Sequence, residues 1–128
     1  MTITHLLGVM LGGGLGSVVR FVVTYMMLQW CPAYRGLGTL VVNVVGCFAI
    51  GFLAGAGVEH KWMSAEWRIF LVSGVLGGLT TFSSFALETA LLSRPGSLAM
   101  GVGHIAANLV LGLSAVLLGE RLATLWTI

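Results

Sequence analysis

The stretch Leu76–Phe85 reads LGGLTTFSSF, and it places two glycines, two threonines and two serines within a long apolar segment. Glycine costs a helix about 1 kcal/mol relative to alanine, and threonine adds a smaller penalty. A helix through this stretch is therefore expected to break at Gly77 and Gly78. Irregular backbone is tolerated at membrane depth only where it lines a cavity or is buried in protein. The stretch thus predicts an interrupted membrane helix whose freed carbonyls and amides face a cation or an anion.

The whole chain has the composition of a membrane protein. Of its 128 residues, 58% are hydrophobic and only 8% are charged, with a mean hydropathy of +1.04. A helix needs about 20 residues to cross a hydrocarbon core of about 30 Å. We predict an all-α membrane protein with one four-helix transmembrane domain over residues 1–128, whose spans are 4–29, 37–58, 67–92 and 97–120.

The basic residues give almost no preference for one orientation under the positive-inside rule. Three lie on the side of the N-terminus (Lys61, Arg68, Arg121), and three lie on or lean toward the other side (Arg35, Arg94, Arg20). One interpretation is that the chain inserts both ways up and forms an antiparallel dimer. The other is that topology depends on a partner or on the first helix alone. A net charge of +2 without a basic tract indicates no nucleic-acid partner.

Glycines recur at intervals of four in three of the predicted spans. Small residues at this spacing form a flat face on which a neighbouring backbone can approach closely. The pattern predicts tight helix packing and carries no functional information by itself. The glycines concerned are Gly8, Gly12 and Gly16, then Gly51 and Gly55, then Gly74 and Gly78.

Polar residues lie inside the second, third and fourth spans. Such residues more often tie membrane helices together than bind a solute. His104 alone fits a packed neutral histidine better than a proton relay. Arg20 either extends to the interface or stands at the mouth of a path and attracts anions. The others are Thr39, Asn43, Ser83, Ser84 and Asn108.

These polar residues are hydrogen-bond donors with few acids among them. Glu88 is the one carboxylate near the membrane interior, whereas cation pathways normally carry rings of carboxylates or carbonyls. Phe82 and Phe85 lie three apart, so on a resumed helix they share a face, and their positive ring edges can meet an anion. The pattern favours a path for a small anion over a path for a cation.

Three motifs resemble the signature segments of the Fluc fluoride channels, also called the CrcB family. They are GTLVVN ending at Asn43, GGLTTFSSF ending at Phe85 and GSVVR ending at Arg20. The resemblance implies a dual-topology antiparallel homodimer with two pores that exports fluoride passively. This chain reads TTFSSFA where the family commonly reads TTFSTFS. Ala86 therefore lacks a hydroxyl between the second phenylalanine and Glu88.

The resemblance also implies roles for single residues. Asn43, Phe82 and Phe85 would line the pore, Ser84 would belong to a polar track, and Arg20 would lie near a vestibule. Backbone carbonyls of Gly77 and Thr80 from both subunits would hold a structural Na⁺ at the dimer centre. Adding the residues from the polar pattern, the expected anion-binding set is Asn43, Phe82, Phe85, Ser83, Ser84, Thr39, Asn108 and His104.

The function that the resemblance implies is a passive fluoride channel in a bacterial inner membrane that lowers fluoride toxicity in the cytoplasm. The alternative is a small multidrug-type dual-topology transporter, but such a carrier needs a carboxylate that the first span lacks. An accessory subunit without transport activity would need the glycines but not the polar residues. An enzyme is not expected, since no Ser/His/Asp arrangement or metal-ligand set is apparent.

Overall fold

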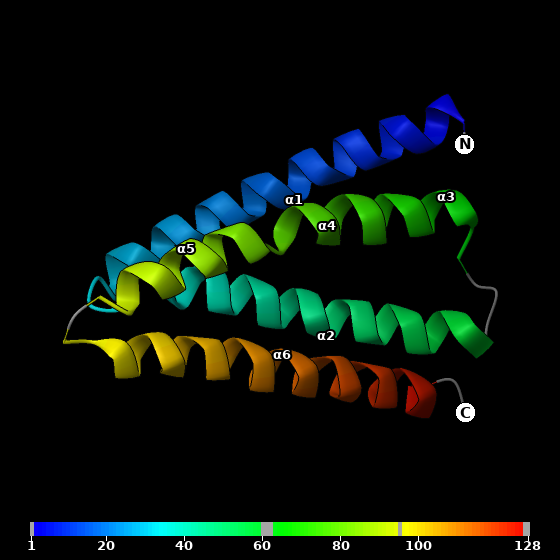
Figure 1. Ribbon diagram of the computed structural model, residues 1–128. Coiled ribbons are helices and arrows are strands. Elements are labelled where there is room, and N and C mark those ends of the chain that lie inside the picture. Colours follow the sequence, from blue (N-terminus) through cyan, green and yellow to red (C-terminus); the bar gives the residue numbers. More distant parts are fainter. Residues whose placement is uncertain (1, 60–62, 95, 127–128) are drawn as a thin grey trace.

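The computed structural model describes residues 2–59, 63–94 and 96–126, in which all regular structure is helical (Figure 1). Lys61, one of the charges weighed for orientation, lies outside these ranges. Three spans are single helices, and the third is a series of four short segments. The single helices are α1 (Ile3–Trp30), α2 (Leu37–Glu59) and α6 (Leu98–Trp126). The third span comprises α3 (Ala65–Arg68), the π-helical η1 (Ile69–Leu76), α4 (Gly77–Leu79) and α5 (Phe82–Leu92).

The helices cross the membrane four times, as the composition predicts. Four segments of the described chain are long and apolar enough to span it: Ile3–Trp30, Leu37–Ala56, Ala65–Leu92 and Leu98–Leu125. Their ends agree with the expected spans to within a few residues. The outer faces of α1 and α6 carry many exposed large apolar side chains, including Leu15, Phe21 and Leu117, which is the surface that lipid covers.

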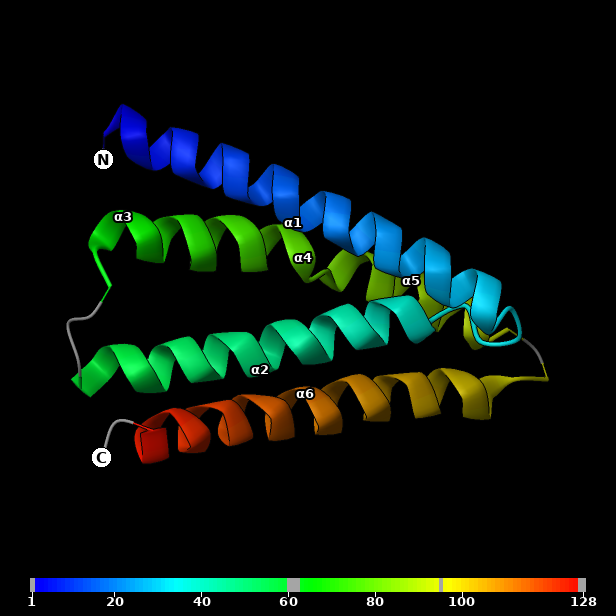
Figure 2. The same ribbon diagram turned by 180° about the vertical axis from the view of Figure 1, so that it is seen from behind.

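The four spans form two pairs. In both views α1 runs along the η1 and α4 part of the third span, and α2 runs along α6 (Figures 1 and 2). The start of α1 and the end of α6 lie at one end of the bundle. The turn between α1 and α2 lies at the other end, together with the end of α5. This topology brings Arg35 and Arg94 to the same end of the molecule.

The glycine repeats lie where these paired helices touch, which confirms their predicted role in packing. A Cβ atom on Gly12 would lie 3.0 Å from the Gly74 Cα, and one on Gly16 would lie 2.7 Å from the Leu79 nitrogen. In the second pair, a Cβ on Gly55 would lie 2.7 Å from the Glu120 carbonyl. Side chains at these positions would force the backbones apart, so the sequence spacing fixes which helix faces meet.

The third span breaks three residues later than we expected. Gly77 and Gly78 are helical, whereas Thr80 (φ −81°, ψ 153°) and Thr81 (φ −150°, ψ 123°) are extended. Gly78 instead permits close approach, because a Cβ there would meet the Gly13 backbone. Groups from other helices bind the backbone of the threonines at the break. These tertiary contacts decide where the helix ends, and they outweigh the low helix propensity of the glycines.

Candidate functional site

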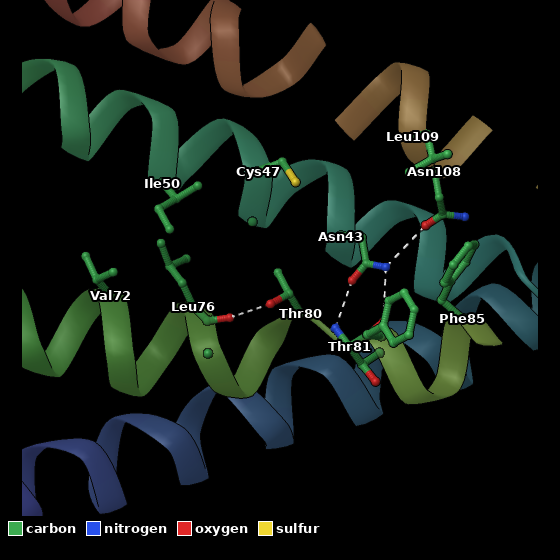
Figure 3. Close-up of a pocket in the computed structure, with 13 residues that line it drawn as sticks. Asn43, Cys47, Ile50, Val72, Leu76, Thr80, Thr81, Phe85, Asn108 and Leu109 are labelled. Atoms are coloured by element: carbon green, nitrogen blue, oxygen red, sulfur yellow. Dashed lines mark hydrogen bonds between the residues drawn. The ribbon is translucent and has the colours of Figure 1, made fainter. Parts of the chain in front are cut away.

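The Asn43 side chain holds the break in the third span. Its Oδ1 accepts a hydrogen bond from the Thr81 amide at 2.9 Å, and its Nδ2 donates to the Thr81 carbonyl at 3.2 Å (Figure 3). The same Nδ2 lies 3.2 Å from Asn108 Oδ1 on α6. One amide thereby replaces the backbone partners that Thr81 loses on leaving the helix. The contact links three spans at membrane depth.

A cluster of hydroxyls begins the helix after the break. The Thr81 hydroxyl caps α5 by accepting from the Ser84 amide at 3.2 Å. The same hydroxyl donates to Ser84 Oγ at 3.2 Å and lies 3.3 Å from Ser83 Oγ. Ser83 is exposed, whereas Ser84 is half-buried. The break therefore presents three hydroxyls and the amide end of a helix, which is an arrangement suited to an anion.

Arg20 reaches the break from α1. Its guanidinium lies 3.4 Å from the Thr80 carbonyl oxygen, and the residue is half-buried. This contact places the end of the side chain beside the break. A positive charge at this depth favours anions over cations nearby.

A second polar cluster lies beyond Asn108, towards the end of the bundle that carries Arg35 and Arg94. Thr39 Oγ1 donates to Glu88 Oε1 at 2.7 Å, and His104 Nε2 lies 3.5 Å from Glu88 Oε2. The Tyr34 hydroxyl lies 2.6 Å from His104 Nδ1. Burial and the Glu88 carboxylate raise the pKa of Tyr34 above its usual value of 10.0, so its hydroxyl keeps its proton. His104 and Thr39 are each only 1% exposed.

The two phenylalanines lie between the polar clusters. The Phe85 ring centre is 5.6 Å from that of Phe82 and 5.4 Å from that of His104. Phe82 is 79% exposed on the surface of the chain. The predicted pair therefore does share a face, and Phe85 joins the break to the histidine cluster.

Two cavities adjoin this row of groups. The first measures about 410 Å³ and contacts both asparagines, both phenylalanines and the break (Figure 3). The second measures about 400 Å³ and is lined by Arg35, Glu88, Leu91, Leu92 and Arg94. Asn108 lines the first cavity and its Nδ2 donates to the His104 carbonyl at 3.0 Å, while His104 Nε2 lies 3.5 Å from Glu88, which lines the second. Polar groups thus run from Arg20 at the break to Glu88 at a mouth with two arginines.

The structure brings together the residues that the sequence analysis selected, and it adds three. Thr81, Glu88 and Tyr34 were not in the expected set, yet each makes a direct hydrogen bond to a member of it. A carboxylate inside a membrane span was a signal that pointed to Glu88. Tyr34 gave no such signal, because its partner His104 is 70 positions away in the chain.

The helix break also changes the hydrogen bonding of the backbone oxygens expected to hold Na⁺. In a continuous helix the Gly77 carbonyl would accept from the Thr81 amide, but that amide donates to Asn43. The Thr80 carbonyl accepts only at long range from Arg20, and each carbonyl has two lone pairs. Within the described residues no three His, Cys, Asp or Glu side chains gather as a metal site. A cation here would be held by neutral carbonyl oxygens.

The sequence matches known proteins over most of its length. Residues 7–120 match the family described as CrcB-like protein, Camphor Resistance (CrcB). The chain is 45% identical over 118 residues to the "Fluoride-specific ion channel FluC" of Rhizobium meliloti (strain 1021), covering 92% of this chain and 94% of that protein. It is 47% identical over 112 residues to the protein of the same name from Opitutus terrae, covering 86% and 85% of the two chains.

Proposed function

Since this chain belongs to the CrcB family, we propose that it is a passive fluoride-selective channel through which fluoride leaves the bacterial cell. The observation that carries the proposal is the row of polar groups from the break at Thr81 through Asn43 and Asn108 to His104. The similarity of the chain to proteins named fluoride-specific ion channels identifies fluoride as the proposed ion. The chain is a multi-pass membrane protein, so the row lies where an ion must cross.

Fluoride holds its water tightly, so a path must offer replacement donors that are numerous and individually weak. An ion on this path would draw on the amide hydrogens of Asn43 and Asn108 and the hydroxyls of the Thr81 cluster, which would exchange their present partners for it. The edge of the Phe85 ring adds a weak positive contact between them. Arg20 at the break raises the local concentration of anions. It does not hold an anion irreversibly, because its guanidinium already contacts the Thr80 carbonyl.

The direct test is fluoride efflux from liposomes that contain the purified protein, with valinomycin and K⁺ balancing the charge. Rapid loss of fluoride with retention of chloride is the expected result. Liposomes without protein and liposomes loaded with chloride are the controls. Equal loss of both anions would contradict selectivity, and no fluoride loss from correctly assembled protein would contradict the channel. Proton flux stimulated by a cationic drug would instead support the exchanger that the sequence analysis kept as its alternative.

The proposal includes an antiparallel homodimer as the conducting unit. The cavity beside Asn43 and Thr81 includes Phe82, whose ring a single chain leaves 79% exposed in the bundle surface. A second copy would close this cavity. The even distribution of basic residues between the two ends allows the two copies to insert in opposite orientations.

Opposite orientations can be tested by adding lysines at exposed positions. Ala33→Lys with Ala99→Lys adds two charges to one end of the bundle, and Thr4→Lys with Ala65→Lys adds two to the other end. Each double variant should insert one way and lack fluoride efflux when expressed alone. Expression of the two together should restore it. Full efflux from either variant alone would contradict the antiparallel arrangement.

Na⁺ at the dimer centre is the last part of the proposal. The oxygens offered by Gly77 and Thr80 are of the kind that unwound membrane helices use for Na⁺. One chain offers two of them, so a second copy is needed to surround the ion. When bound, Na⁺ would tie the two helix breaks together and fix the geometry of the adjoining Asn43 contacts.

A further inference from the structure

The buried histidine beside Glu88 has a role that the fluoride path by itself does not require. The His104 side chain has no exposed surface, and that of Glu88 is 17% exposed. His104 Nε2 and Glu88 Oε2 are both buried and make no hydrogen bond within the described part of the chain, although they lie only 3.5 Å apart. Burying two polar atoms without hydrogen-bond partners costs free energy, unless another group bonds to them part of the time.

The contacts of His104 fix which of its nitrogens carries the proton. The Tyr34 hydroxyl lies 2.6 Å from Nδ1, and Asn108 Nδ2, an amide nitrogen that can only donate, lies 3.5 Å from the same atom. Nδ1 is therefore the acceptor, and in the neutral ring the hydrogen resides on Nε2, which faces the carboxylate. Gly36 leaves room for the ring, because a Cβ there would lie 2.9 Å from Nδ1.

The groups packed around His104 include one carboxylate and several neutral side chains. The turn after α1 contributes Tyr34, α5 contributes Glu88 and the apolar Phe85, α2 contributes the neutral Thr39, and α6 itself contributes the neutral Asn108. Arg35 and Arg94 line the cavity that Glu88 borders. Among the described residues, Glu88 and His104 thus form the pair that can exchange a proton with water at this mouth.

We infer that Glu88 and His104 form a shared proton-binding site that controls the entry of fluoride between the Arg35–Arg94 mouth and Asn108. The inference rests on the proposed channel function. With Glu88 ionised and His104 neutral, the pair carries a net negative charge and opposes an anion. One proton taken from water, shared by the facing Oε2 and Nε2 atoms, makes the pair neutral overall. Fluoride flux therefore rises as the pH falls.

The effect is measurable as the pH dependence of valinomycin-dependent fluoride efflux. We expect efflux at about pH 5.5 to exceed that at about pH 7.5, because more of the pairs hold the additional proton at the lower pH. The increase should be about tenfold, at the low end of the effect of charge at a cleft. Neutral HF crosses lipid without valinomycin, so efflux in its absence is measured at each pH and subtracted.

Two variants separate the members of the pair. Glu88→Gln keeps the contact with Thr39 and removes the negative charge, so its efflux at about pH 7.5 should equal that of the unmodified protein at about pH 5.5. His104→Gln leaves the carboxylate without its partner, so efflux should stay low at neutral pH and rise only at lower pH. His5→Gln, at the far end of α1, is the matched control and should keep the original profile.

The outcomes distinguish this inference from the proposed function. Fluoride efflux at the same rate at both pH values would overturn the inference and leave the channel intact. A full pH response in Glu88→Gln would overturn it as well, and an unaltered profile in His104→Gln would remove the histidine from the site. The absence of efflux at every pH would instead contradict the channel function itself.

Discussion

At the residue scale, Asn43 has the most consequential contacts in the chain. Its short side chain satisfies both backbone groups of Thr81 and reaches Asn108 on another span. An asparagine can do this because it carries an acceptor and two donors on one amide. The same amide that supports the break is thus also a donor along the proposed ion path.

Asn43→Ala is expected to lower the free energy of unfolding by about 1–3 kcal/mol, because it leaves buried polar groups of Thr81 without partners. Fluoride efflux should fall as well. Unfolding in detergent, followed by circular dichroism, measures the first effect. Val45→Ala is the control, since Val45 is 54% exposed two positions away. Equal stability of the two variants would mean that Asn43 does not support the break.

Phe85→Ile tests the aromatic contact while largely keeping the apolar volume. We expect fluoride efflux to fall about tenfold, which corresponds to about 1.4 kcal/mol, near the upper range of an aromatic interaction. The same change at Phe82 should have a similar effect in the assembled protein. Phe21→Ile, at a ring 70% exposed on α1, is the control in the same efflux assay. Unchanged efflux would exclude the ring at position 85 from the ion path.

At the element scale, the third span is the part of the fold that differs most from a regular helix. A π-helical segment precedes the break, and an N-capping threonine follows it. The π-helical turns alter the direction of side chains, and such segments are frequent at functional sites. Glycines on α1 let this irregular span lie directly against a neighbouring backbone. The polar groups of the break are consequently held inside the bundle.

Gly16→Ala is expected to destabilise the protein by about 1–3 kcal/mol, because its Cβ would meet backbone that cannot move freely. Its closest contacts would be the Val75 carbonyl oxygen and the Leu79 nitrogen, the latter at 2.7 Å and next to the break. Gly14→Ala is the matched control on the same helix, since no atom lies within 4 Å of its Cβ. Thermal unfolding in detergent should separate the two variants, and a higher midpoint for Gly16→Ala would refute the packing argument.

At the scale of the whole molecule, one chain provides a row of polar groups but leaves part of it in the bundle surface. Phe82 and the cavity beside it would be covered by a second copy in the proposed dimer. The helix breaks of the two copies would then supply the carbonyls for Na⁺. Assembly, the central ion and conduction are therefore linked in the proposal.

Na⁺ is expected to raise the thermal stability of the assembled protein. A ligand at about 100 times its dissociation constant stabilises the native state by about 2.7 kcal/mol. Unfolding midpoints should therefore be higher in NaCl than in N-methylglucamine chloride of equal ionic strength. Equal midpoints in the two salts would argue against Na⁺ at the carbonyls of Gly77 and Thr80. This measurement does not depend on fluoride transport.

The sequence by itself determined the membrane class, the four spans and the faces on which helices pack. Hydropathy sets the first two because each span must bury about 20 residues in lipid, and glycine spacing sets the third because only small residues permit close approach. It also identified most of the polar residues that meet in the structure, since polar groups inside a span must face protein or water.

Only the tertiary structure decided where the third span breaks and which groups meet at its ends. The break lies at Thr80–Thr81 because Asn43, from another helix, binds the freed backbone of Thr81 there. Helix propensities along one segment carry no information about such a contact. The Tyr34–His104–Glu88 contacts likewise join parts of the chain that are far apart in sequence. Such contacts depend on how whole helices align, and a local pattern of residues does not specify that alignment.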